Sequence, residues 1–132
     1  METKIDIKEQ IKTFDDALAK VGETVEAFAA RTALDAPDEV AYKKIKVIAN
    51  ALNQGWKPNW KDSNEYKYYP WFDFEDDNGS GLGLSYFGFV GGYSVSIVGS
   101  RLCYKTRSLA IYAGEQFAEL YAQMMVIKEG EE

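Results

Sequence analysis

The chain has 132 residues, of which 46% are hydrophobic and 27% charged, so its composition is that of an average globular domain with one hydrophobic core. The absence of histidine excludes Ser-His and Cys-His catalytic pairs and histidine-ligated metal sites within one chain, and a single cysteine, Cys103, excludes an internal disulfide. Fifteen basic against twenty-one acidic residues give a net charge of −6, which opposes nonspecific attraction to phosphate backbones.

The amino-terminal residues favour a cytoplasmic protein. Met1 is followed by Glu2, Thr3 and Lys4, and this charged start lacks the apolar run of a secretory signal. No stretch approaches the roughly twenty apolar residues that a transmembrane helix requires. We therefore expect a cytoplasmic location and no membrane partner.

The first third of the chain is predicted to be helical. Apolar residues recur every three or four positions, at Ile7, Ile11, Phe14, Leu18, Val21, Val25 and Phe28. This spacing places all seven on one face of a continuous helix. Thr13 and Asp16 also match a capping box, which leaves a second interpretation open. In that interpretation Gly22 ends a helix at about 14–22, and a short helix follows at 25–31.

The next helix has clearer boundaries. Pro37 lies in its first turn and is followed by acidic residues, a pattern typical of a helix start. Gly55 provides a left-handed stop, so Trp56 is expected to lie back on the last turn. Residues 57–67 are predicted to form an ordered polar loop.

Beyond this loop the apolar period changes to two, which is typical of strands. The alternating positions are Phe72 and Phe74, then Leu82, Leu84 and Tyr86, then Val95 and Ile97, then Leu102 and Tyr104. Turn residues separate these runs at residues 76–79 (Asp-Asp-Asn-Gly), at Gly91-Gly92 and at Gly99. We therefore predict four short antiparallel strands in a meander.

These elements predict a single α+β domain over residues 1–132. N-terminal helices span about 6–55, the four-stranded antiparallel sheet spans about 68–105, and a carboxy-terminal helix at about 107–128 packs on the sheet. The expected core face of the sheet carries Phe72, Phe74, Tyr86 and Tyr104.

The opposite face of the predicted sheet is unusually aromatic. Tyr69, Trp71, Phe87 and Phe89 are expected to project there, with Trp60 nearby. Monomers rarely expose an apolar patch of this size, so either helices bury the face or it binds a partner. Because aromatic anchors dominate interface energetics, these five residues are the predicted binding surface.

An acidic cluster lies at the first predicted turn and comprises Asp73, Glu75, Asp76 and Asp77. A calcium loop of the EF-hand type would need glutamate at its twelfth position, where this chain has Leu84. A carboxylate pair for glycoside hydrolysis remains an alternative. A solvated turn is the favoured interpretation, because Asp and Asn suit turns for local reasons.

A basic cluster lies at the end of the predicted sheet and just after it. Arg101, Lys105 and Arg107, with Tyr104 between them, form a candidate surface for single-stranded nucleic acid. A second group, Lys43, Lys44 and Lys46, would extend it. The net acidity and the lack of an RNP-like motif disfavour this partner.

Two further features are weaker. Residues 79–83, Gly-Ser-Gly-Leu-Gly, lack the spacing of a phosphate-binding loop. Cys103 is expected to be a small buried hydrophobe rather than a nucleophile. The sequence therefore assigns no catalytic residue, no cofactor and no metal site.

Two segments carry distinctive strings of residues. They are Ala51-Leu52-Asn53-Gln54-Gly55-Trp56-Lys57-Pro58-Asn59-Trp60, continuing through 66–72, and Val98-Gly99-Ser100-Arg101-Leu102-Cys103-Tyr104-Lys105-Thr106, leading into 110–117. These segments resemble a family of small uncharacterised proteins associated with bacteriophages and prophages of gut anaerobic bacteria. The resemblance covers roughly the last 90 residues. It implies a phage-related context, with the host cell cytoplasm as the location, and no reaction.

The sequence as a whole predicts a phage-associated accessory module that binds a protein and performs no catalysis. One alternative is a carboxylate-based enzyme or a saccharide-binding domain. The other is a protein that binds single-stranded nucleic acid.

Overall fold

A computed structural model describes residues 6–62, 64–73, 85–92 and 101–126. At Trp71, at Asp73 and throughout 85–92 it describes the backbone and not the side chains.

The amino-terminal segment forms three short helices rather than one. The capping box predicted at Thr13 is present: its hydroxyl accepts from the Asp16 N–H at 3.1 Å, and the Asp16 carboxylate accepts from the Thr13 N–H at 3.1 Å. Gly22 ends the second helix in the left-handed conformation, with φ +83°. The prediction of one continuous helix is therefore wrong, and the alternative of separate helices at about 14–22 and 25–31 is confirmed. The helices are α1 (Ile7–Gln10), α2 (Phe14–Val21) and α3 (Val25–Arg31).

The long helix α4 (Pro37–Asn53) begins at Pro37, as predicted from its proline and acidic first turn. It ends one residue earlier than a Gly55 stop implies, because Gln54 already adopts the left-handed conformation with φ +52°. Gly55 continues this turn with φ +83°. The Trp56 N–H then donates to the Asn53 carbonyl at 3.0 Å, which holds Trp56 against the end of α4.

The predicted four-stranded antiparallel sheet is wrong. The described part of the chain is mostly helical, and its strands β1 (Lys67–Asp73) and β2 (Ser85–Gly92) form one antiparallel ladder. The register runs from Lys67 opposite Gly92 to Asp73 opposite Ser85, with an irregularity after Trp71. The α+β meander is thus replaced by a helical body with a single two-stranded ladder.

Two observations explain this difference. Gly91 and Gly92, predicted as a turn, lie inside β2 opposite Tyr68 and Lys67. Tyr104, predicted in a fourth strand, forms only an isolated bridge with Tyr68, because Thr106 two residues later caps a helix. The strand predicted at Val95 and Ile97, and the turns predicted at 76–79 and Gly99, lie outside the described residues.

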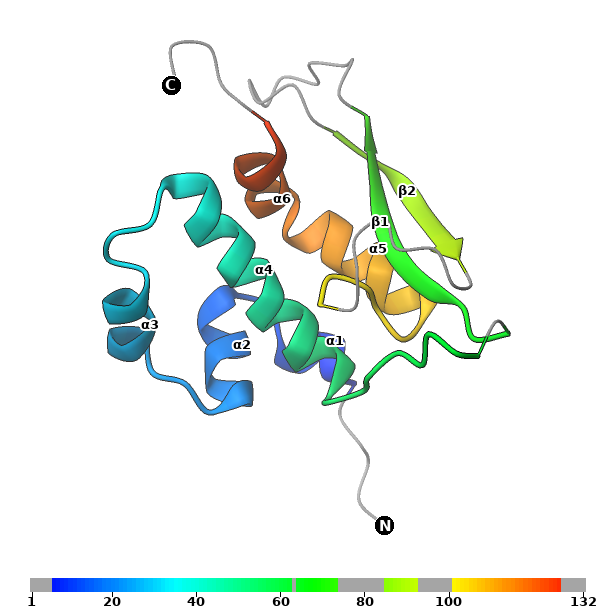
Figure 1. Cartoon of the computed structure of the whole chain (residues 1–132), viewed down its shortest axis with the longest axis horizontal. Coiled ribbons are helices and arrows are strands. Elements are labelled where there is room, and N and C mark those ends of the chain that lie inside the picture. The colour runs from blue at the N-terminus through cyan, green and yellow to red at the C-terminus, as the bar shows by residue number, and fades with distance from the viewer. Residues whose placement is uncertain (1–5, 63, 74–84, 93–100, 127–132) are drawn as a thin grey trace.

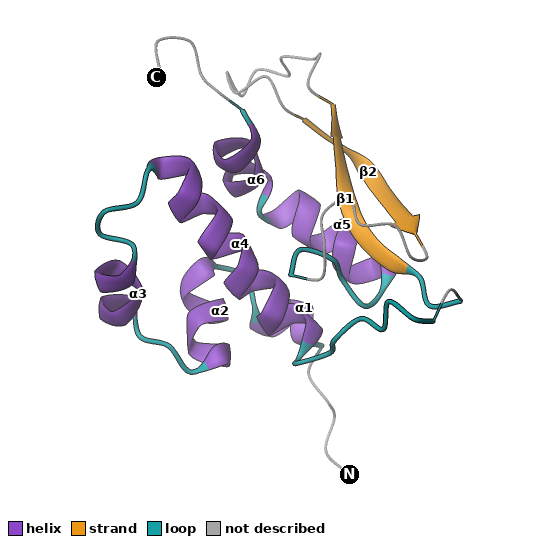
Figure 2. Ribbon diagram, viewed as in Figure 1, coloured by secondary structure: helices purple, strands orange, loops and turns teal. Residues whose placement is uncertain are grey.

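The predicted carboxy-terminal helix is divided at Phe117. Helix α5 (Arg107–Gln116) starts from the Thr106 hydroxyl, which accepts from the Leu109 N–H at 3.1 Å. Helix α6 (Ala118–Met125) follows directly, and Figure 2 shows the change of direction between the two. No helix of the described residues is long and apolar enough to cross a membrane.

Helix α4 is the centre of the fold. It contacts α2 on one side and α5 and α6 on the other, and α5 in turn contacts both strands (Figure 1). The most completely buried larger side chains are Ile11, Leu18, Ile45, Ile48, Leu52, Lys67, Cys103 and Tyr104. Burial of Phe72 and Tyr104 confirms that part of the predicted core face. This core fixes the end of α4 relative to the segment 101–106, where the candidate site lies.

Candidate functional site

The predicted aromatic surface is only partly described. Trp60 is half-buried, whereas Tyr69 is only 5% exposed and its ring is therefore not available on the surface. The side chains of Trp71, Phe87 and Phe89 lie outside the description. Their backbones are placed by the ladder, which pairs Trp71 with Gly88 and Phe89 with Pro70. Tyr69 is therefore not part of an exposed surface, and a protein-binding role for Trp60, Trp71, Phe87 and Phe89 stays a prediction.

The half-buried Trp60 belongs to a loop that is organised by Lys67. The Lys67 ammonium is buried and donates to the carbonyl oxygens of Asn59, Asp62 and Glu65 at 2.8, 3.2 and 2.9 Å. It also lies 3.3 Å from the Glu65 carboxylate and 5.2 Å from the centre of the Trp60 ring. Trp60 therefore has a structural role in this loop.

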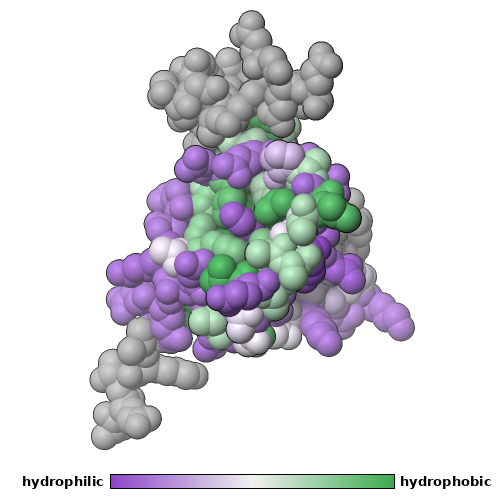
Figure 3. Space-filling view, turned by 90° about the vertical axis from the view of Figure 1, so that its left-hand side faces the viewer, coloured by the Kyte–Doolittle hydropathy of each residue, from purple (hydrophilic) through white to green (hydrophobic). Residues whose placement is uncertain are grey.

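Apolar side chains are exposed at a different place, around α3. Leu34 is fully exposed and Val25 is 54% exposed, the two highest values among the large apolar side chains described. Figure 3, which faces this side of the molecule, shows apolar surface inside a hydrophilic rim. Val25 and Phe28 belong to the same predicted apolar helix face, yet Phe28 is buried and Val25 is exposed.

A pocket of about 540 Å³ is the strongest candidate site. It lies along one face of α4, between the end of α3, the turn at 56–58 and Arg101. Its five cationic side chains, which define what we call the basic pocket, are Arg31, Lys43, Lys46, Lys57 and Arg101. None of its described lining residues is acidic, although the chain carries a net charge of −6.

Two of these cations have carboxylate partners just outside the pocket. Arg31 donates to both oxygens of Glu23 at 2.6 and 2.9 Å, and this bond lowers the pKa of the Glu23 carboxyl. Lys43 donates to Asp35 at 2.6 Å. Both pairs are partly exposed, so each contributes little to stability.

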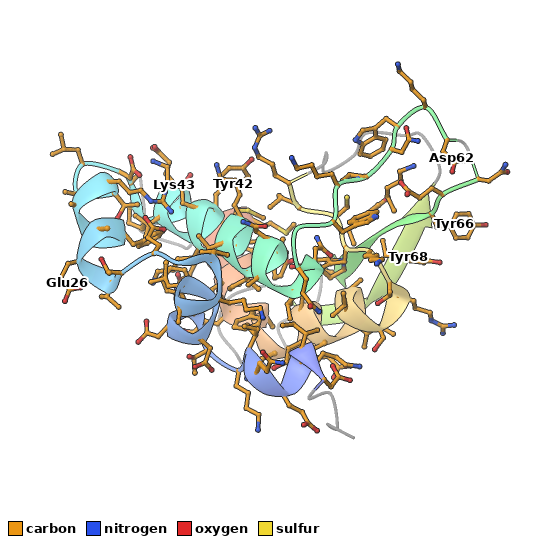
Figure 4. All side chains as sticks on the ribbon, turned by 90° about the horizontal axis from the view of Figure 1, so that it is seen from below. Glu26, Tyr42, Lys43, Asp62, Tyr66 and Tyr68 are labelled. Atoms are coloured by element: carbon orange, nitrogen blue, oxygen red, sulfur yellow. The ribbon has the colours of Figure 1, made fainter. Side chains whose placement is uncertain are left out.

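The other three cations have no carboxylate partner in the described part of the chain. The Lys46 ammonium lies 5.4 Å from the centre of the Tyr42 ring. Neither Lys57 nor Arg101 makes a hydrogen bond or ion pair with the described residues. Figure 4 shows Tyr42 and Lys43 on one side of α4, at the far end of the molecule from the loop that carries Asp62 and Tyr66. Within the described part of the chain, the positive charge of Lys46, Lys57 and Arg101 is therefore not neutralised by a carboxylate.

A second pocket, of about 790 Å³, adjoins the first. The two share Asn53 and Trp56 in their linings. Lys8 and Lys105 line the second pocket, and Lys8 donates to the Ser108 hydroxyl at 2.5 Å. Asp6 also lines it and lies 3.7 Å from the Lys8 ammonium, so this adjoining pocket is less strongly basic.

Asn53 fixes the boundary between the two pockets. Its buried amide donates to the Cys103 carbonyl and accepts from the Lys105 N–H, both at 2.9 Å. These bonds attach the end of α4 to the segment that carries Arg101 and Lys105. Arg101 then lines one pocket and Lys105 the other, and Trp56 lines both.

The basic residues singled out in the sequence are thus divided by the structure. Arg101 lines the basic pocket, Lys105 lines the adjoining pocket, and Arg107 lines neither. Lys44 turns towards the Phe14 ring, at 5.2 Å, and leaves the group formed by Lys43 and Lys46.

Four residues of the basic pocket that bear on its chemistry, Arg31, Asn50, Trp56 and Lys57, were not predicted from the sequence as part of a site. The sequence offered one further signal for such a pocket: Lys43, Lys46 and Asn50 are spaced by three and four residues, which places them on one helix face.

The remaining candidate residues from the sequence are Cys103 and the acidic cluster. Cys103 is buried, and this burial raises the pKa of its thiol to about 11, so the thiol is protonated near neutral pH. The acidic cluster from Asp73 to Asp77 lies outside the described side chains. Among the residues that the structure describes, no group of three acidic or cysteine side chains is placed to hold a metal ion.

Comparison of the chain with protein-family models, with curated proteins and with solved structures finds no match.

Proposed function

We propose that this protein is a non-enzymatic binding module whose ligand is an anion seated in the basic pocket. The observation that carries the proposal is the gathering of five cationic side chains around one cavity with no acidic residue among its described lining. A third of the fifteen basic residues of an acidic chain are thus placed together.

Electrostatics supports a bound anion. Like charges that share a pocket repel one another, and an anion among them replaces repulsion by attraction. Lys46, Lys57 and Arg101 have no carboxylate partner in the described structure to do this. The volume of about 540 Å³ falls within the range of small-ligand sites.

The chemistry of the lining favours binding over catalysis. Ammonium, guanidinium, amide and indole groups hold and orient an anion. The buried Cys103 thiol, with its pKa raised to about 11, is not a nucleophile near neutral pH. An accessory module of this kind also suits the phage context that the resemblance implies.

The test compares two variants with the same net charge. One carries Lys46→Gln, Lys57→Gln and Arg101→Gln in the basic pocket. The control carries Lys12→Gln, Lys20→Gln and Lys61→Gln, which change exposed lysines that line neither pocket. Binding of inorganic polyphosphate and of an oligothymidine with a similar number of phosphates is measured by titration calorimetry at about 50 mM salt.

We expect native and control proteins to bind at least one polyanion, and the pocket variant to bind about a hundred-fold more weakly, since three charge contacts are lost. If the native chain binds neither polyanion, or if the pocket and control variants bind alike, the proposal is wrong.

A further inference from the structure

We infer that the anion is a single strand of nucleic acid that runs from the basic pocket across Trp56 into the adjoining pocket. This inference rests on the proposed function and names the ligand class of the same site. It depends on the shape of the combined cavity, on Trp56 and on the amide of Asn50.

The length of the site suits an extended ligand. Lys43 and Asn53 are ten residues apart on α4, which corresponds to about 15 Å along the helix axis. A single phosphate or sulfate ion reaches hydrogen-bond donors only about 3 Å away, so it cannot contact both ends of the basic pocket. Because the two pockets share Asn53 and Trp56, the path continues to Lys105.

Trp56 lies where a base would stack. It is partly exposed and lines both pockets, and it shares the basic pocket with Lys57 and Arg101 and the adjoining pocket with Lys105. Alternation of cations with an aromatic ring is the general arrangement of single-strand sites, in which phosphates contact the cations and a base stacks on the ring. Inorganic polyphosphate or an acidic peptide would make no comparable use of the indole.

The two asparagines of the basic pocket differ in a way that also favours a base. Both hydrogen-bonding atoms of the Asn53 amide are engaged, by Cys103 and Lys105. Asn50 lines the same pocket, is exposed and makes no hydrogen bond within the described structure. Its amide offers a donor and an acceptor together, which match the edge of a base and not a phosphate.

The adjoining pocket suits a continuing strand. It includes Thr106 and Ser108 at the start of the ten-residue helix α5, whose first turn contains no acidic residue. The positive end of that helix adds to the charge of Lys105. Pockets of about 540 and 790 Å³ admit nucleotide-sized groups and not a duplex, whose minor groove and two backbones present a far broader surface.

The test measures fluorescence anisotropy of a labelled oligothymidine of about ten nucleotides, a length within known single-strand site sizes. Unlabelled duplex of the same length, polyphosphate and polyglutamate serve as competitors. Trp56→Ala and Trp56→Phe probe the ring, and Tyr66→Ala is the control because Tyr66 is an exposed aromatic residue that lines neither pocket. Thermal unfolding establishes that each variant is folded.

We expect the single strand to bind most tightly, Trp56→Ala to weaken it about ten-fold or more, and Trp56→Phe to retain most of the affinity. Lys105→Gln should reduce the slope of log affinity against log salt by about 0.7, as for one lost contact to a single strand. This variant tests the path into the adjoining pocket even if Trp56→Ala does not fold.

Three results overturn the inference while the proposed function stands. The first is that polyphosphate, polyglutamate or duplex competes as well as the unlabelled single strand. The second is that Trp56→Ala and Trp56→Phe both bind with native affinity, and the third is that the salt slope is unchanged in Lys105→Gln. Absence of binding to every polyanion overturns the proposed function itself.

Discussion

The hydroxyl oxygens of Tyr104 and Tyr121 lie 2.8 Å apart, and both side chains are buried. This hydrogen bond connects the segment that carries Arg101 and Lys105 to α6. Each hydroxyl satisfies the other in an interior where an unpaired polar group is costly.

Tyr104→Phe should therefore destabilise the protein by about 1–3 kcal/mol, because it leaves the buried Tyr121 hydroxyl without a partner. The double variant Tyr104→Phe/Tyr121→Phe removes both hydroxyls and should be close to native stability. Urea unfolding of the two single variants and the double variant measures these changes. Additive losses would contradict the pairing.

Tyr69 provides the opposite case. Its hydroxyl oxygen is buried and has no hydrogen-bond partner among the described residues, and burial raises the pKa of this phenol. Tyr69→Phe should stabilise the fold by about 1 kcal/mol, because it removes an unsatisfied polar group without changing the shape of the ring. The same urea experiment measures the gain. A loss of stability would indicate that the hydroxyl has a partner.

Stability should fall at alkaline pH. Burial raises the pKa of Cys103 from 9.0 to about 11 and raises the pKa of Tyr104 and Tyr121 above the ordinary value of 10.0. Between the unfolded and folded pKa the folded state holds more protons than the unfolded state, so the free energy of unfolding decreases as pH rises. The contribution of Cys103 is fully present below pH 9 and decreases up to about pH 11.

Comparison of the native chain with Cys103→Ala isolates that contribution. The difference in unfolding free energy between the two should change by at most about 3 kcal/mol over this interval. A pH-independent difference would show that the thiol titrates normally in the folded protein.

The parts of the fold that were predictable from sequence are those determined by neighbouring residues. The capping box of Thr13 and Asp16, the left-handed Gly22 and the opening at Pro37 each depend on contacts within four residues. The prediction of four strands was wrong because alternation of apolar and polar residues does not distinguish a ladder from an isolated bridge. Tyr104 is buried as its pattern predicts, yet it pairs at one position only.

The candidate site was less predictable because it depends on contacts between distant segments. Arg31, Lys57 and Arg101 meet only after α4 has packed between α2 and α6 and after Asn53 has bound the segment at Cys103. Their charge was readable from the sequence, and their proximity was not. The same holds for Lys67, a charged residue whose burial depends on converging carbonyl groups.

Lys67 should be essential for the loop at 57–66. Lys67→Met keeps much of the aliphatic stem but leaves three carbonyl oxygens without their donor, so we expect a loss of about 3 kcal/mol and faster amide exchange in the loop. Hydrogen exchange and urea unfolding measure the two effects. Lys61→Met, an exposed position in the same loop, is the control. Equal behaviour of the two variants would contradict this role.

Glu23 and Asp35 should restrain ligand binding. Each neutralises one cation of the basic pocket, Arg31 or Lys43, from a position outside the lining. Glu23→Gln with Asp35→Asn frees both cations and should tighten oligothymidine binding by about two- to five-fold for each, the value of a partly exposed ion pair. The salt slope should steepen by about 0.7 for each new phosphate contact.

The control for this gain is Glu115→Gln with Glu119→Gln, which changes net charge equally on α5 and α6 at exposed positions that line neither pocket. If the control tightens binding as much, the gain comes from net charge. A gain confined to the variant at Glu23 and Asp35 locates the ligand beside Arg31 and Lys43. It would also mean that these carboxylates lower the affinity for the oligothymidine and, at the same time, weaken the attraction of other polyanions.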